Sequence, residues 1–163
     1  MSSSLVRRVS SLAWMLCALT AASSAAQPAQ PRTFPADMQP LLSALKRAKY
    51  TVLLARPPIQ GAYGATDSRR KLIWVAPISI DMGIVRQTLI HEAVHAAQSC
   101  PTGKLEPLGV NVPLDYKIDR EISGLLYRGY AHSKFEIERE AFALQGKADA
   151  PALLIQQLNQ RCR

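Results

Sequence analysis

The pattern of apolar and polar positions along the chain predicts a mostly helical protein with one small sheet. Apolar residues recur at helical spacing over 36–49 and again over 115–128. Short apolar runs bounded by Gly, Pro or turn residues predict three strands, with a turn at 66–68 joining the second to the third. These strands are expected over 50–55, from a start within 61–64, and over 71–76.

Cap residues place the remaining helices. They are expected from Ser79 or Asp81 to about Ser99, from Ser133 to about Gln145, and from Asp149 to near Asn159. The second of these begins with the capping box Ser-x-x-Glu over 133–136 and ends at Gly146, a suitable C-cap. The sequence therefore predicts an α+β fold, with an antiparallel or mixed three-stranded sheet before the central helix.

The N-terminal residues have the pattern of a secretory signal peptide. Arg7 and Arg8 form a basic segment, a mostly apolar stretch covers 9–22, and Ala26 ends a run of small residues suited to cleavage. The apolar stretch is shorter than the roughly 20 residues that a membrane span needs. The predicted organisation is a signal peptide over 1–26, a Pro-rich lead-in over 27–35 and one domain over 36–163.

Charge narrows the range of partners. Two of the 20 Lys and Arg residues and none of the 12 Asp and Glu residues precede position 27, so the remainder has 18 − 12 = +6. No basic run is interleaved with aromatic residues, so nucleic-acid binding is not expected. No membrane span is expected after signal cleavage, and the sequence does not indicate an oligomeric state.

The most informative motif is His-Glu-Ala-Val-His at 91–95, an HExxH sequence. Residues one turn apart lie on the same helix face, so His91 and His95 can direct their imidazoles at one metal ion. Glu92 lies beside that point and can take a proton from a water on the metal. A helix that has the motif by chance is the alternative. The apolar residues around the motif favour a metal, because a buried helix must satisfy such polar side chains.

A catalytic zinc usually has three protein ligands. A third histidine at the metzincin spacing is excluded, because Pro101 occupies that position. Apolar periodicity in the helix after Ser133 places Glu138 toward the interior and Glu140 on a more solvated edge, while Glu136 belongs to the capping box. Periodicity therefore favours Glu138 as the third ligand, with Glu140 as the alternative.

HExxH on one helix, followed by Glu-x-x-Ala on a later helix, resembles the gluzincin branch of zincin metallopeptidases, and in particular its minimal single-domain members. The resemblance implies that Glu138, three residues before Ala141, ligates zinc. The chain departs from the pattern at Phe142, where many members have an Asp or Asn that orients the first histidine. The resemblance also implies that the strand over 71–76 is an edge strand that pairs with an extended substrate.

Motif and resemblance together predict an exported zinc-dependent metallopeptidase that acts on a peptide or protein. Zn²⁺ is expected on His91, His95 and Glu138, with Glu92 as general base and then proton donor to the leaving amine. The alternative is a catalytically silent or zinc-stabilised exported binding protein. Candidate oxyanion donors, among which the sequence does not choose, are Tyr116, Tyr127, Tyr130 and His132.

Cysteine usage agrees with export. Cys17 leaves with the signal peptide, so the mature chain has Cys100 and Cys162. A pair of cysteines in an exported protein is usually a disulfide, which would tie the last helix to the end of the HExxH helix. The expected location is the periplasm or the exterior.

Overall fold

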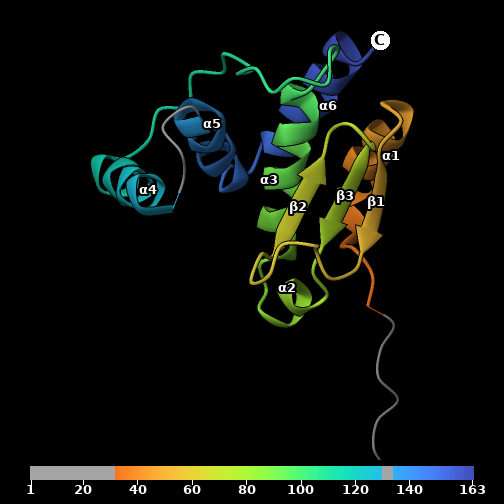
Figure 1. Ribbon diagram of the computed structural model, residues 1–163, viewed down its shortest axis with the longest axis horizontal. Helices are drawn as coiled ribbons and strands as arrows, with labels where there is room; N and C mark the ends of the chain where they lie inside the picture. The colour runs from red at the N-terminus through yellow and green to blue at the C-terminus, as the bar shows by residue number, and fades with distance from the viewer. Residues whose placement is uncertain (1–31, 130–133) are drawn as a thin grey trace, which may run out of the picture. The chain divides into compact units, whose positions relative to one another are not determined.

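The computed structural model describes residues 32–129 and 134–163, and within them the fold is α+β, as the sequence predicts (Figure 1). The described elements are η1 Ala36–Met38, α1 Gln39–Arg47, β1 Thr51–Leu54, β2 Gly64–Asp67, β3 Leu72–Val75, α2 Ile78–Asp81, α3 Val85–Gln98, α4 Tyr116–Gly129, α5 Phe135–Gln145 and α6 Ala150–Arg161. None of these helices is long and apolar enough to cross a membrane. The expected signal peptide and the expected cap Ser133 lie outside the described residues.

The sheet is mixed, with the strand order β1-β3-β2. β1 runs parallel to β3 and β2 runs antiparallel to it. β3, within the predicted strand over 71–76, is therefore the central strand, so the expectation that it is the edge strand is wrong. The order of the strands in the sequence does not indicate this arrangement. β1 pairs with one side of β3 and β2 with the other, so β2 is the edge strand that contacts α3.

The turn between β2 and β3 lies later than predicted. Thr66 and Asp67 belong to β2, and the turn covers 68–71. The Asp67 carboxylate accepts hydrogen bonds from the backbone N–H groups of Arg69 at 3.0 Å and Arg70 at 2.9 Å. Asp67 thus stabilises the turn from the last position of the strand, and Thr66 is free to face α3.

Two predicted helices are divided in the structure. The helix expected over 36–49 is a 3-10 turn followed by α1, which has Pro40 in its first turn, where a missing N–H costs nothing. The helix expected from Ser79 or Asp81 is interrupted at Gly83, whose φ of 69° is left-handed. Neither proposed cap is used for α3, because Ser79 Oγ donates to the Ala76 carbonyl and Asp81 pairs with Arg32.

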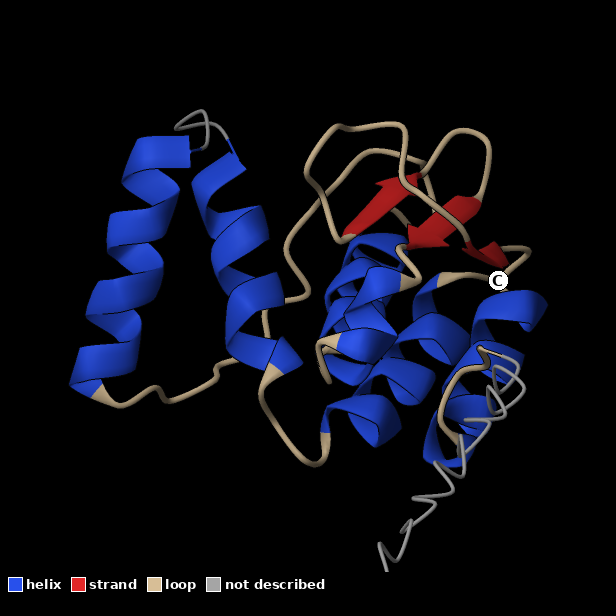
Figure 2. Cartoon of the chain, turned by 90° about the horizontal axis from the view of Figure 1, so that it is seen from below, coloured by secondary structure: helices blue, strands red, loops and turns tan. Residues whose placement is uncertain are grey.

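Helix α3 lies at the centre of the fold, between the sheet on one side and α5 and α6 on the other (Figures 1 and 2). Eleven of its 14 residues are buried, and these include Glu92, His95 and Gln98. Burial on all sides explains why the apolar positions of this helix show little preference for one face. The polar side chains of α3 must therefore find partners inside the protein.

The predicted disulfide is confirmed. Cys100, just after α3, is bonded to Cys162, just after α6, with their Cα atoms 5.0 Å apart. The bond joins the end of the HExxH helix to the end of the last helix. It therefore fixes one end of α3 in place against the C-terminal helix.

Candidate metal centre

The two motif histidines meet on the α5 side of α3. His91 and His95 are one turn apart, and their Nε2 atoms are 3.2 Å from each other. Both side chains are nearly buried, with 13% and 11% of their surface exposed. Two imidazole nitrogens directed at one point in the protein interior define a place for a proton or a metal ion.

Helix α5 adds a carboxylate to this pair. Glu138 Oε2 lies 3.4 Å from the Nε2 atoms of both His91 and His95. The three ligand atoms therefore form a nearly equilateral triangle, and the residues are a buried group able to bind a metal ion. Donors arranged tetrahedrally at about 2.0–2.1 Å from an ion are about 3.3–3.4 Å apart, so the triangle has the size that such an ion requires.

Glutamines on the far side of each imidazole orient the two rings. Gln98 Oε1 lies 2.8 Å from His95 Nδ1, and Gln145 Oε1 lies 3.0 Å from His91 Nδ1. The Gln98 amide nitrogen donates to the carboxylate of Glu140 and to a backbone carbonyl, so its oxygen must face His95. In the neutral form of His95, Nδ1 then has the hydrogen, and Nε2 presents its lone pair to the triangle.

Sequence reasoning did not assign these glutamines a role, although a signal was present. Gln145 follows Glu138 by seven residues, two turns along the same face of α5. It supplies the acceptor that the resemblance led us to expect at Phe142. The Phe142 ring instead packs edge-on against the His91 ring, with the centroids 4.7 Å apart.

Glu140 differs from the sequence expectation. Apolar periodicity predicts a solvated edge for this residue, but only 9% of its surface is exposed. Its carboxylate accepts from Gln98 Nε2 at 2.8 Å and from the backbone N–H groups of Leu108 and Val110 at 2.7 and 3.2 Å. The loop over 104–114 covers this face of α5, which helical periodicity does not reveal. Glu140 is thus bound to the loop and to Gln98 and is not among the group of possible metal ligands.

Glu92 lies on the sheet side of the histidines and is 6% exposed. Its Oε2 accepts a hydrogen bond of 2.8 Å from Thr66 Oγ1 on β2. A Cβ placed on Gly64 would lie 2.5 Å from Glu92 Oε1 and 2.7 Å from its Cγ, so only glycine leaves space for this carboxylate. The edge strand β2 therefore fixes Glu92 through one hydroxyl and one missing side chain.

The charges of the group are coupled. Burial favours a higher pKa for Glu138, but hydrogen bonds from His91 and His95 outweigh it and lower the pKa to about 2. Burial favours a lower pKa for His95, but the hydrogen bond to Glu138 and the charge of Glu92 raise its pKa above the ordinary value. The Glu138 carboxylate and the His95 imidazole thus each favour the charged form of the other.

The proposed oxyanion donors remain without an assignment. Tyr116 and Tyr127 lie on α4 and are 76% and 68% exposed. Tyr130 and His132 lie outside the described residues. Neither Tyr116 nor Tyr127 is therefore assigned a role at the metal centre.

Fold and site define a class: an α+β protein with a buried two-histidine, one-glutamate group between two helices. The chain belongs to a protein family described as Domain of unknown function (DUF8637), which matches residues 80–163, just over half of the chain. The matched part includes the three possible ligands, Glu92 and both disulfide cysteines, whereas the sheet precedes it. No curated protein and no solved structure matches the chain.

Proposed function

We propose that this protein is a zinc-dependent peptidase of the gluzincin type, with zinc bound by His91, His95 and Glu138. The observation that supports this most strongly is the convergence of these donors, 3.2–3.4 Å apart, from two helices separated in sequence. Glu92 stands beside them with its carboxylate fixed by Thr66. Metal-ion catalysis of hydrolysis requires a set of metal ligands and a nearby carboxylate that acts as general base.

The donor set favours zinc over other common divalent ions. Two imidazole nitrogens and one carboxylate oxygen suit zinc, whereas magnesium and calcium prefer oxygen ligands alone. An octahedral site with bonds of about 2.0–2.1 Å would place neighbouring donors only about 2.9 Å apart. The observed distances of 3.2–3.4 Å agree better with a tetrahedral ion that has one position open for water or substrate.

Each residue then has a distinct task. Bound zinc would polarise the carbonyl of the scissile peptide and make a water molecule acidic near neutral pH. Glu92 accepts the proton of that water at its carboxylate and delivers it to the leaving amine. Thr66 and Gly64 determine the position of that carboxylate, and the open edge of β2 offers backbone groups to an extended peptide.

The disulfide supports export. Cys100 and Cys162 are bonded to each other, and such bonds persist in the periplasm or outside the cell but are rare in a reducing cytosol. Together with the signal-like pattern over 1–26, this favours a peptidase that acts in one of these compartments.

Zinc analysis and hydrolysis of an unfolded protein test the proposal together. Purified mature protein should contain one zinc per chain, His91→Ala should contain almost none, and Glu92→Gln should keep its zinc but lose hydrolysis of unfolded casein. Glu121→Gln, an exposed glutamate on α4, is the matched control and should be fully active. Wild-type protein that binds zinc without hydrolysis would favour the catalytically silent binding protein, and negligible zinc in every variant would refute the metal centre.

A further inference from the structure

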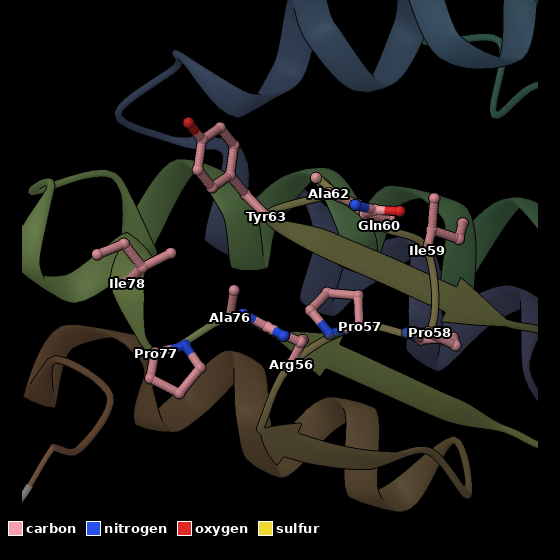
Figure 3. Close-up of a pocket in the computed structure, with 11 residues that line it drawn as sticks. Arg56, Pro57, Pro58, Ile59, Gln60, Ala62, Tyr63, Ala76, Pro77 and Ile78 are labelled. Atoms are coloured by element: carbon pink, nitrogen blue, oxygen red, sulfur yellow. The ribbon is translucent and has the colours of Figure 1, made fainter.

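A groove opens next to the first residue of β2. Its walls are the connection after β1 and the segment after β3, and its volume is about 760 Å³, within the range of small-ligand and side-chain pockets. In Figure 3, Tyr63 and Ile78 project at one end and Ile59 at the other, with Pro57 and Ala76 between them. The groove is therefore lined mainly by apolar side chains.

These apolar side chains are unusually exposed. Ile59, Ile78 and Tyr63 have 62%, 50% and 45% of their surface accessible. The one charged residue that lines the groove is Arg56. Exposed apolar groups at one place indicate a binding surface, and a single arginine among them favours a partner with a carboxylate near its apolar group.

Consecutive residues of the chain link the groove to the candidate metal centre. Tyr63 directly precedes Gly64, where an added Cβ would meet the Glu92 side chain. The Tyr63 carbonyl accepts a hydrogen bond of 2.7 Å from the Ala76 N–H, which makes residues 63 and 76 a bonded pair of the antiparallel ladder. Because bonding alternates along such a ladder, the backbone groups of Gly64 and Thr66 point to the open edge of β2.

A peptide bound along that edge would reach the groove within a few residues. Each residue of an extended strand advances the chain by about 3.3 Å. A peptide paired with Gly64 and Thr66 passes Glu92 and continues past Tyr63, where one of its side chains enters the groove. The groove thus begins one residue before Gly64, along the strand that would bind the peptide.

We propose that this groove binds a bulky apolar side chain of the peptide that lies along β2, and that Arg56 favours an acidic group beside it. This inference rests on the proposed peptidase function and extends it to the choice of substrate. The partner is an extended peptide with a residue such as Leu or Phe a few positions from the scissile bond. A peptide with Gly in that place leaves the groove empty.

Binding and cleavage of labelled peptides test this separately. Short peptides that place Phe, Leu or Gly at each position in turn are bound to zinc-loaded Glu92→Gln protein and are cleaved by wild-type protein. Ile78→Ser should weaken binding of the Phe peptide about tenfold and leave the Gly peptide unchanged. Ile118→Ser on α4 is the matched control, because Ile78 and Ile118 are each 50% exposed. Arg56→Gln should reduce the preference for an acidic neighbour only.

The outcomes separate the groove from the peptidase. Selective binding that Ile78→Ser removes, without cleavage by wild-type protein, would support the groove and refute the peptidase. Cleavage without dependence on Ile78 or on the apolar residue would support the peptidase and overturn the groove. A Phe peptide that competes with self-association, detected as a change in sedimentation, would show that the groove binds a second copy of the chain instead.

Discussion

Replacement of Gly64 by alanine gives the sharpest test of how the sheet controls Glu92. In the structure, the added Cβ would lie 2.5 Å from Glu92 Oε1, 2.7 Å from Cγ and 2.9 Å from Cδ. An ordinary contact needs about 3.5 Å or more, so the carboxylate must move by about 1 Å. The Glu92 side chain is 6% exposed and has little room to move without losing its 2.8 Å hydrogen bond from Thr66.

The expected loss of kcat follows from the size of this displacement. A misplacement of about 1 Å in a catalytic group can cost about 100-fold in rate, so Gly64→Ala should lower kcat by about that factor. Zinc binding should change far less than kcat does, because Glu92 is not among the possible metal ligands. The substitution therefore distinguishes the proposed role of Glu92 as base from the proposed binding of zinc.

The assay compares kcat on a labelled peptide with the zinc dissociation constant of each variant. Gly146→Ala is the matched control, because a Cβ there meets nothing within 4 Å and its φ of −87° suits alanine. Thr66→Val, which removes the hydroxyl and keeps the shape, should reduce kcat less than Gly64→Ala does. Full activity in Gly64→Ala would refute the argument, and loss of zinc in that variant would show that the strand positions the metal rather than the base.

Further predictions concern the ligands, the disulfide and pH. Glu138→Ala should weaken zinc binding by at least about 100-fold, measured by zinc titration. Glu140→Ala should instead lower the free energy of unfolding in urea by about 2–3 kcal/mol, because a buried amide and two backbone N–H groups lose their acceptor. The reverse pattern would make Glu140 the ligand. Serine in place of both Cys100 and Cys162, which are 62 residues apart, should cost about 4 kcal/mol of stability in urea unfolding, and a loss below about 1 kcal/mol would contradict this. Metal-free protein should be most stable between about pH 4.5 and 6.5. The pKa of Glu138 is lowered to about 2, so its stabilisation is complete above pH 4.5 and is lost as pH falls toward 2. The pKa of His95 is raised, so its stabilisation is complete below pH 6.5 and is lost as pH rises through the pKa of the folded state. Thermal unfolding with a chelator tests this, and a midpoint that does not change across the range would refute it.

Helical periodicity was sufficient to place Glu138 toward the interior, because that placement depends only on geometry within α5. The apolar residues of that helix determine which side faces the core, and Glu138 lies on that side. The same reasoning was wrong about Glu140, which is buried by a loop 30 residues earlier in the chain, at Val110. A loop without regular structure leaves no periodic signal, so burial by such a loop cannot be predicted from the sequence.

The order of the strands in the sheet also could not be predicted from local sequence. The three strands were predicted from local composition, but their order depends on long-range pairing. β1 and β3 pair in parallel although β2 lies between them in the chain, and this makes β2 an edge strand. The role of Gly64 follows only from that order, since a glycine at the start of a strand usually indicates no more than a turn.

For the proposed peptidase, the arrangement implies that metal binding and the control of the base are separable. His91, His95 and Glu138 come from α3 and α5, and their orienting glutamines lie on the same two helices. Glu92 also lies on α3, but its partners Thr66 and Gly64 belong to a strand that precedes the family match over 80–163. Substitutions in β2 should therefore change turnover and peptide choice while zinc stays bound, and substitutions in α5 should change zinc affinity. Because α3 is packed against both the sheet and α5, a change that displaces α3 itself should alter zinc binding and turnover together.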